Sequence, residues 1–123
     1  FLVGQAAARL MLKHGGGSIQ FTGASASVKG YATSAPFAMG KFGLRGLAQS
    51  MARELHSQNI HVVHVVVDGG IRSEATGRDD SAGRGPDAWL DPDAIAETYY
   101  HLHAQHRSSW SWEIEVRPWV ETF

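Results

Sequence analysis

Residues 60–67 carry six β-branched side chains in eight positions, interrupted only by His61 and His64. This nearly continuous run lacks the alternation of apolar and polar residues that marks a strand with one face in water. It is typical of a central strand in a parallel sheet, with both faces covered. The rest of the chain is therefore expected to supply neighbouring strands and covering helices.

Patterns for helices and strands alternate along the remaining sequence. Strands that alternate with helices are joined by right-handed crossovers and form a parallel sheet. Asp91 and Pro92 form a helix start, with Asp91 as the N-cap. The expected elements are a helix over residues 1–14, a strand over 18–22, a loop over 23–36, a helix over 38–57, a strand over 60–67, a loop over 68–90, a helix from 91 to about 106, and a half-buried strand formed by Trp112, Ile114 and Val116 alternating with Glu113 and Glu115.

This order predicts one α/β domain over residues 1–123, with a three-layer, Rossmann-like parallel sheet. Each of the first two helices is expected to bury one apolar stripe, and Gly15 can form a left-handed cap after the first. The stripes are Leu2, Val3, Ala6, Ala7 and Leu10 in the first helix, and Leu44, Leu47, Ala48, Met51 and Leu55 in the second. Arg45, Gln49 and Arg53 form a row of polar residues on the adjacent face of the second helix.

Composition excludes several classes of protein. The chain has 43% apolar and 19% charged residues, which is typical of a soluble globular protein. A net charge of −1 gives no basic footprint for nucleic acid or an anionic membrane. Because there are no cysteines, a disulfide framework and a thiolate metal site are excluded, which fits a cytoplasmic location. The longest apolar run is too short to span a bilayer, and no signal peptide is visible.

Phe37 and Lys41 are four positions apart, so on a helix both side chains lie on one face. A tyrosine at position 37 could give a proton to a carbonyl oxygen, and a nearby ammonium group would lower the tyrosine pKa from about 10. Phenylalanine neither donates nor accepts a proton. The alternative interpretation of Phe37 is a buried aromatic residue at a helix start, just after Pro36.

Four segments, in order and with matching spacing, resemble the carboxyl-terminal half of a short-chain dehydrogenase/reductase. The chain begins with Phe1, inside an expected helix, and is itself expected to be a piece of something longer. The matching segments are Gly17-Ser18-Ile19, like the strand that carries the family's serine; Phe37-x-x-x-Lys41, like its Tyr-x-x-x-Lys; Glu54-Leu55 through Ile60-His61-Val62; and Asp68-Gly69-Gly70-Ile71-Arg72-Ser73, like its Pro-Gly-x-Val-x-Thr.

The resemblance implies an NAD- or NADP-linked oxidoreductase that acts on a small carbonyl or hydroxyl substrate. It assigns Lys41 to catalysis and to the nicotinamide ribose. It also implies a homodimer or tetramer, paired through helices 1–14 and 38–57. The cofactor-binding residues that it implies are Lys41, Gly69, Gly70, Ile71 and Ser73.

The chain departs from the family pattern at the positions that do chemistry. The family's serine lies thirteen residues before its tyrosine, which here gives Ala24, with Ser25 one step away on an extended segment. The family's Pro-Gly is Asp68-Gly69. Thr22-Gly23-Ala24-Ser25-Ala26-Ser27-Val28-Lys29 fails as a pyrophosphate fingerprint, because Ser27 and Lys29 replace required glycines. Tight binding of NAD or NADP by these 123 residues alone is therefore not expected.

Other candidate residues have simpler interpretations beside a functional one. Tyr31 is either a displaced proton donor or a loop aromatic, and Asp68 is either an acid/base group or a capping or turn aspartate. Arg72 could reach a phosphate or carboxylate, or belong with neighbouring charges to a solvated loop. No metal site is predicted, because His61 and His64 point to opposite faces of a strand and the helical histidines spread around their helix. Both sets are instead interpreted as surface or helix-end histidines. The charged residues near Arg72 are Arg78, Arg84, Asp79, Asp80 and Asp87. The helical histidines are His101, His103 and His106.

Three functions remain open. The first is an NAD(P)-linked oxidoreductase whose proton donor comes from elsewhere. The second is a non-catalytic protein that binds a dinucleotide or metabolite. The third is a structural fragment that persists by forming an oligomer.

Overall fold

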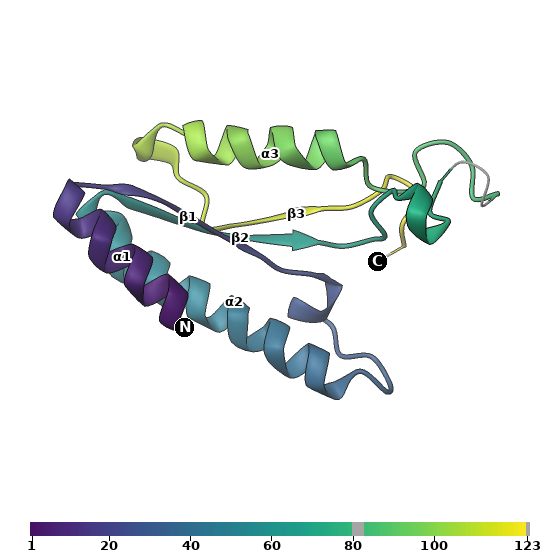
Figure 1. Ribbon diagram of the computed structural model, residues 1–123, viewed down its shortest axis with the longest axis horizontal. Helices are drawn as coiled ribbons and strands as arrows, with labels where there is room; N and C mark the ends of the chain where they lie inside the picture. The colour runs from purple at the N-terminus through teal and green to yellow at the C-terminus, as the bar shows by residue number, and fades with distance from the viewer. Residues whose placement is uncertain (80–82, 123) are drawn as a thin grey trace.

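The fold is a three-stranded parallel sheet between two layers of helices (Figure 1). The computed structural model describes residues 1–79 and 83–122. The strands lie in the order β1-β2-β3, and both pairings are parallel. The α/β, Rossmann-like prediction is therefore confirmed. The main elements are α1 (Leu2–His14), β1 (Gly17–Thr22), α2 (Ala35–Leu55), β2 (Ile60–Val67), α3 (Pro92–Ala104) and β3 (Glu113–Val116).

The central strand β2 is buried along its whole length, as its composition predicts. Its alternate side chains point to opposite faces. Ile60 and Val62 pack on one face, in a cluster with Met51 and Leu55 of α2. On the other face Val63, Val65 and Val67 pack in a cluster with Leu102 of α3. Figure 1 shows α1 and α2 together below the sheet and α3 above it.

The predicted stripe of α1 is wrong except at Ala7, which packs against the core. Leu2, Val3 and Leu10 are exposed, while the buried positions are Gly4 and Ala8. A Cβ added to Gly4 would lie 3.2 Å from the ring of Phe21 and 3.3 Å from the sulfur of Met51. Close approach of the helix backbone to the sheet therefore needs small residues on the inner face, and the large apolar side chains point outward. The predicted cap is confirmed, since Gly15 adopts φ 85°.

Helix α2 begins at Ala35, three residues before the predicted start, with Pro36 in its first turn. Its inner face contains Ala48, Met51 and Leu55, as predicted, whereas Leu44 and Leu47 are only half-buried. Phe37 is 54% exposed, so its interpretation as a buried aromatic residue is wrong. The large exposed apolar side chains of this helix are Phe37, Met39 and Phe42.

The last helix starts as predicted. The Asp91 carboxylate accepts hydrogen bonds from the backbone N–H of Asp93 at 2.8 Å and of Ala94 at 3.2 Å. The helix ends at Ala104, slightly before the predicted end. The last strand, β3, pairs with β2 from His64↔Glu113 to Val67↔Val116.

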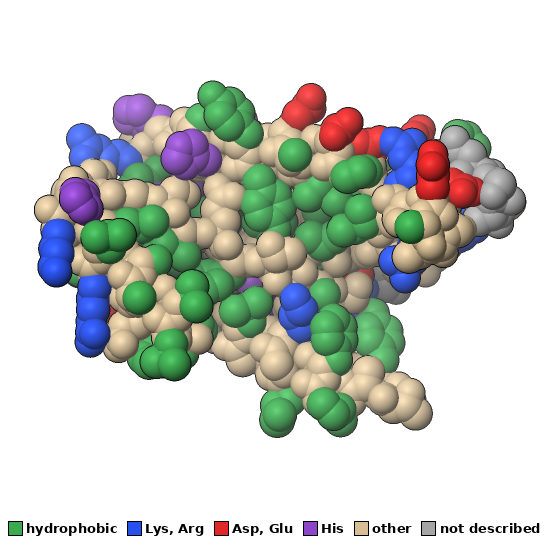
Figure 2. All heavy atoms as spheres, viewed as in Figure 1, with side chains coloured by type: hydrophobic (Ala, Val, Ile, Leu, Met, Phe, Trp, Pro, Cys, Tyr) green, Lys and Arg blue, Asp and Glu red, His purple; other side chains and the backbone are tan. Residues whose placement is uncertain are grey.

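Hydrophobic side chains are visible over the region of α1 and α2 in Figure 2. The exposed ones on α1 are Leu2, Val3, Leu10 and Leu12. Among the described residues, no helix has the length and hydropathy needed to cross a membrane.

Candidate active site

The carboxyl ends of β1 and β2 lie side by side, because Thr22 pairs with Val65 in the parallel register. Open α/β sheets bind ligands at this edge. Lys41 reaches it from the second turn of α2 and donates a hydrogen bond from Nζ to the carbonyl of Thr22 at 2.9 Å. Its ammonium group lies 5.8 Å from the ring centroid of Phe37. The helical spacing thus places both side chains on one face, as the sequence predicts.

The turn that follows β1 is closed by two hydrogen bonds between Ala24 and Ser27. The Ser27 N–H donates to the Ala24 carbonyl at 2.7 Å, and the Ala24 N–H donates to Ser27 Oγ at 3.1 Å. Gly23 is tied to the sheet by a hydrogen bond to the Val65 carbonyl at 2.7 Å. The turn is therefore rigid, and Ala24, at the position expected of the family's serine, presents a methyl group without a hydroxyl.

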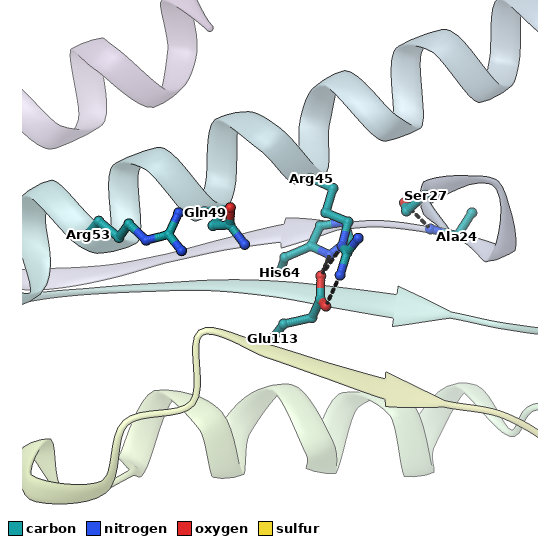
Figure 3. Close-up of polar contacts among 7 residues, drawn as sticks. All are labelled: Ala24, Ser27, Arg45, Gln49, Arg53, His64 and Glu113. Atoms are coloured by element: carbon teal, nitrogen blue, oxygen red, sulfur yellow. Dashed lines mark hydrogen bonds and ion pairs between the residues drawn. The ribbon is translucent and has the colours of Figure 1, made fainter. Parts of the chain in front are cut away.

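Beside this turn lies a partly buried cluster that we call the Arg45 cluster, formed by Arg45, His64 and Glu113 (Figure 3). Arg45 on α2 donates from Nε and Nη2 to the two carboxylate oxygens of Glu113 on β3, both at 2.7 Å. His64 on β2 contacts the same carboxylate through Nδ1 at 2.9 Å. Because an ionised carboxylate only accepts, Nδ1 carries the proton. Three elements are thereby joined through one carboxylate.

In the Arg45 cluster Glu113 is ionised and His64 is neutral, and the two states have different causes. The hydrogen bond from Arg45 lowers the pKa of Glu113 more than burial raises it. Burial lowers the pKa of His64, and the contact with Glu113 offsets only part of that effect. The histidine is fully buried, so the interpretation of His64 as a surface histidine is wrong.

His64 packs directly against the turn after β1. Its Nε2 atom has no hydrogen-bond partner within the described part of the chain. A Cβ added to Gly23 would lie 2.3 Å from this nitrogen and 2.8 Å from Ser27 Oγ, so only glycine fits at position 23. The close approach fixes the height of the turn above the sheet.

A second buried cluster lies at the end of β2, around Asp68. Its carboxylate accepts from Lys29 Nζ at 3.1 Å and pairs with Arg117 Nη2 at 2.8 Å. Burial alone would raise the pKa of Asp68, but hydrogen bonds from Ser25 and Lys29 and the charges of Lys29 and Arg117 outweigh it, so the pKa is lowered. Asp68 is therefore a buried ion-pair residue at the start of the Gly69–Gly70 turn.

The residues expected to bind the cofactor follow Asp68 at the same edge of the sheet. Gly69 adopts φ 154°, and a Cβ on it would lie 2.7 Å from Cδ of Pro118. Gly70 packs as closely against Trp89. Ile71 is 39% exposed and bridges to Leu90, while the Ser73 N–H donates to the Arg78 carbonyl at 2.8 Å. Packing within the chain thus already requires glycine at positions 69 and 70.

The remaining candidates lie apart from this edge or are engaged in other contacts. Arg72 pairs with Asp91, so its guanidinium is held at the start of α3. Tyr31 is exposed on the loop before α2. His61 lies on the α3 side of the sheet, where it is buried and stacked on Trp110 with ring centroids 4.6 Å apart. Asp80 lies outside the described residues.

The two sets of histidines differ in burial, because His101, His103 and His106, at or just after the end of α3, are exposed. His61 and His64 do point to opposite faces, as predicted, but both are buried, contrary to the predicted surface position. The described residues contain no group of three or more histidines or acidic side chains that could hold a metal ion. One sequence signal for the Arg45 cluster exists: a histidine inside a fully buried β-branched run needs a polar partner.

The family model for short chain dehydrogenase matches residues 1–82. Carbonyl reductase family member 4 of Danio rerio is 36% identical over 87 residues, which cover 65% of this chain and 36% of the reductase. The crystal structure of a short-chain dehydrogenase from Rhodopseudomonas palustris is 44% identical, with a TM-score of 0.73, over 94% of this chain and 45% of that chain. A metagenomic short-chain oxidoreductase solved in complex with NADP is 28% identical, with a TM-score of 0.67, and the match covers 90% of this chain and 42% of that chain.

The chain thus spans about a third of the carbonyl reductase and less than half of the bacterial dehydrogenase. Fold, order of elements and sequence agree over the part that is shared. The chain belongs to the short-chain dehydrogenase family, whose activity implies NAD or NADP as the cofactor.

Proposed function

We propose that this chain supplies the nicotinamide-side half of an NAD(P)-linked oxidoreductase that acts on a small carbonyl or hydroxyl substrate. The observation that carries the proposal is the position of Lys41 at the carboxyl edge of the sheet, hydrogen-bonded to the Thr22 carbonyl. The relative solved with NADP supports the choice of cofactor class. When bound, the nicotinamide supplies or accepts the hydride, and Lys41 would hold its ribose.

The described residues offer contacts for one end of such a cofactor. Lys41 and the backbone at Gly69, Gly70, Ile71 and Ser73 lie on the carboxyl side of β1 and β2. The turn after β1 offers no glycine-rich cradle for the pyrophosphate, because Ser27 is buried within it and Lys29 is paired with Asp68. Binding by the encoded polypeptide, including any residues that precede Phe1, should therefore be much tighter than binding by the 123 residues alone.

A titration of NADH and NADPH tests this function. In the encoded polypeptide, Lys41→Met should weaken binding and Lys13→Met, on the outer part of α1, should not. The 123-residue chain should show no low-micromolar binding. Equal binding by Lys41→Met and by the unchanged polypeptide would contradict the role of Lys41, and low-micromolar binding to the short chain would contradict the division of the cofactor site.

A non-catalytic dinucleotide-binding protein is the second candidate function. It is favoured by the side chains at the candidate active site, since Phe37 and Ala24 have no hydroxyl. Turnover of a panel of carbonyl compounds with added cofactor distinguishes the two. Binding without turnover supports the second function, and turnover above background supports the first.

A further inference from the structure

Asp68 is contacted by two segments that are distant from it, and from each other, in sequence. Ser25 and Lys29 reach it from the turn after β1, and Arg117 reaches it from the end of β3. The backbone N–H of Asp68 also donates to the Val116 carbonyl at 2.8 Å. We call Asp68 with these three partner side chains the Asp68 clamp.

The clamp lies between the two backbone turns that form the candidate active site. One is the turn over residues 23–29, which carries Ala24 at the position expected of the family's serine. The other is the Gly69–Gly70 turn, which starts at the residue after Asp68. The second turn is also anchored to the segment that carries Arg117, because Gly69 packs against Pro118.

We propose that Asp68 is a positioning residue that fixes the substrate-side turn over residues 23–29 relative to the nicotinamide-side turn at Gly69–Gly70. The inference rests on the proposed function for the identity of the two ligands. It goes beyond that function by assigning the alignment of hydride donor and acceptor to one buried carboxylate. A displacement of about 1 Å in such an alignment can cost a factor of about 10² in rate.

The contacts of Asp68 exclude a direct role in proton transfer. Its side chain is 5% exposed, and its carboxylate is paired with the charged groups of Lys29 and Arg117. The clamp therefore acts through the backbone of the two turns.

The partners of Asp68 differ in how much of the fold depends on them. Removal of the buried Asp68 carboxylate would take an ionic partner from the mostly buried Arg117, and the loss of one member of a buried ion pair is strongly destabilising. The Lys29 side chain is 33% exposed, so its ammonium can be removed with little loss of packing. Lys29→Met is thus the variant that perturbs the clamp and keeps the fold.

Amide hydrogen exchange in the 123-residue chain tests the coupling without any cofactor. The Leu90 N–H donates to the Gly70 carbonyl at 2.9 Å and reports on the nicotinamide-side turn. In Lys29→Met the exchange rate of the Leu90 amide should rise by about tenfold, as expected for the loss of one charge-assisted hydrogen bond. Lys29→Arg should restore slow exchange. Glu115→Gln, which removes a partner of Arg117 but no contact of Asp68, is the matched control.

The exchange of buried β2 amides separates positioning from general loosening. These amides should keep their exchange rates in Lys29→Met. If the Leu90 amide is unchanged in Lys29→Met, or if it changes only together with the β2 amides, the clamp does not couple the turns and the inference is overturned.

Kinetics of the encoded polypeptide test the alignment itself. Lys29→Met should lower kcat by about 10-fold or more while KM for the cofactor stays within about twofold, because alignment and binding are separate contributions. An unchanged kcat with normal cofactor binding would overturn the inference. If the unchanged polypeptide binds no NAD(P)H, the proposed function fails, and the exchange experiment still decides whether Asp68 couples the two turns.

Discussion

Position 37 determines how a proton can reach a substrate carbonyl. Phe37 is more than half exposed, and the Lys41 ammonium lies near its ring. A hydroxyl added to this ring would therefore meet solvent and Lys41 and would not disturb the core. Carbonyl reduction by the encoded polypeptide is expected to be slow, because a positioned general acid contributes roughly 10²–10⁴-fold.

Restoring the two missing hydroxyls should raise this rate. Phe37→Tyr combined with Ala24→Ser is expected to increase kcat by about 10²-fold or more, measured with a panel of carbonyl compounds. The two gains need not multiply, since residues that act as a unit are not additive. Fast turnover by the unchanged polypeptide, abolished in Tyr31→Phe, would instead identify Tyr31 as the donor.

Two buried histidines make stability depend on pH. Burial lowers the pKa of both His61 and His64 from the ordinary value of 6.5. The unfolded chain therefore binds protons at a higher pH than the folded chain does. The contribution of each histidine is complete above about pH 6.5 and is lost as the pH falls below it, by at most about 1.4 kcal/mol per pH unit per histidine.

Urea unfolding at pH 8, 7, 6 and 5 measures this loss. The free energy of unfolding should fall between pH 7 and pH 5, and His64→Gln should reduce the slope. His101→Gln, at an exposed position on α3, should leave the slope as it is. Equal slopes in all three proteins would show that His64 is not held neutral by the fold.

At the scale of single elements, the start of α3 depends on one carboxylate. Asp91 accepts from two backbone N–H groups and also pairs with Arg72. Asp91→Ala should destabilise the chain by about 1 kcal/mol, the typical effect of losing an N-cap. Asp93→Ala, in the same first turn but with an exposed side chain, should cost less. Thermal unfolding of both variants makes the comparison, and equal losses would contradict the capping role.

Elements with a strong local signal could be predicted from the sequence. The β-branched run gave β2, and the Asp91-Pro92 pair gave the start of α3. The burial of α1 could not be predicted, because its apolar residues cover much of the helix and only the close approach at Gly4 selects the inner face. Glu113 was expected on the solvent-exposed face of a half-buried strand, whereas in the structure its carboxylate pairs with Arg45 of α2.

The same limit applies to the candidate active site. The spacing of Phe37 and Lys41 is local and placed both residues correctly on one helical face. The Arg45 cluster joins residues from three elements, and its members are separated by nineteen positions or more. No local pattern relates such residues, so their contacts emerge only from the register of β2 and β3.

At the scale of the whole molecule, the surface predicts self-association. Leu2, Val3 and Leu10 on α1, and Met39 and Phe42 on α2, are exposed apolar side chains on the helical layer below the sheet. Exposed apolar side chains on one layer favour association, and closed two-fold pairing would bury them against a copy of the same layer. Met51 is buried and Leu47 packs on the core, so other side chains of the two helices would make this contact.

Light scattering tests this prediction. The chain should form a dimer or tetramer at micromolar concentration, and Leu10→Glu should shift it toward the monomer. Tyr100→Glu, at an exposed position on α3 in the opposite layer, should not. A cooperatively folded monomer before any substitution would contradict the prediction.

The parallel register also determines how the chain can reach its fold. Each strand pair joins residues more than forty positions apart, Gly17 with Ile60 and His64 with Glu113. Within the described residues the sheet contains no hairpin that could form early and template the next strand. Closure of long loops must precede any gain from strand pairing, and chains rich in such distant contacts fold slowly. Until both crossovers close, the apolar β2 segment stays accessible to chaperones, proteases and other nascent chains.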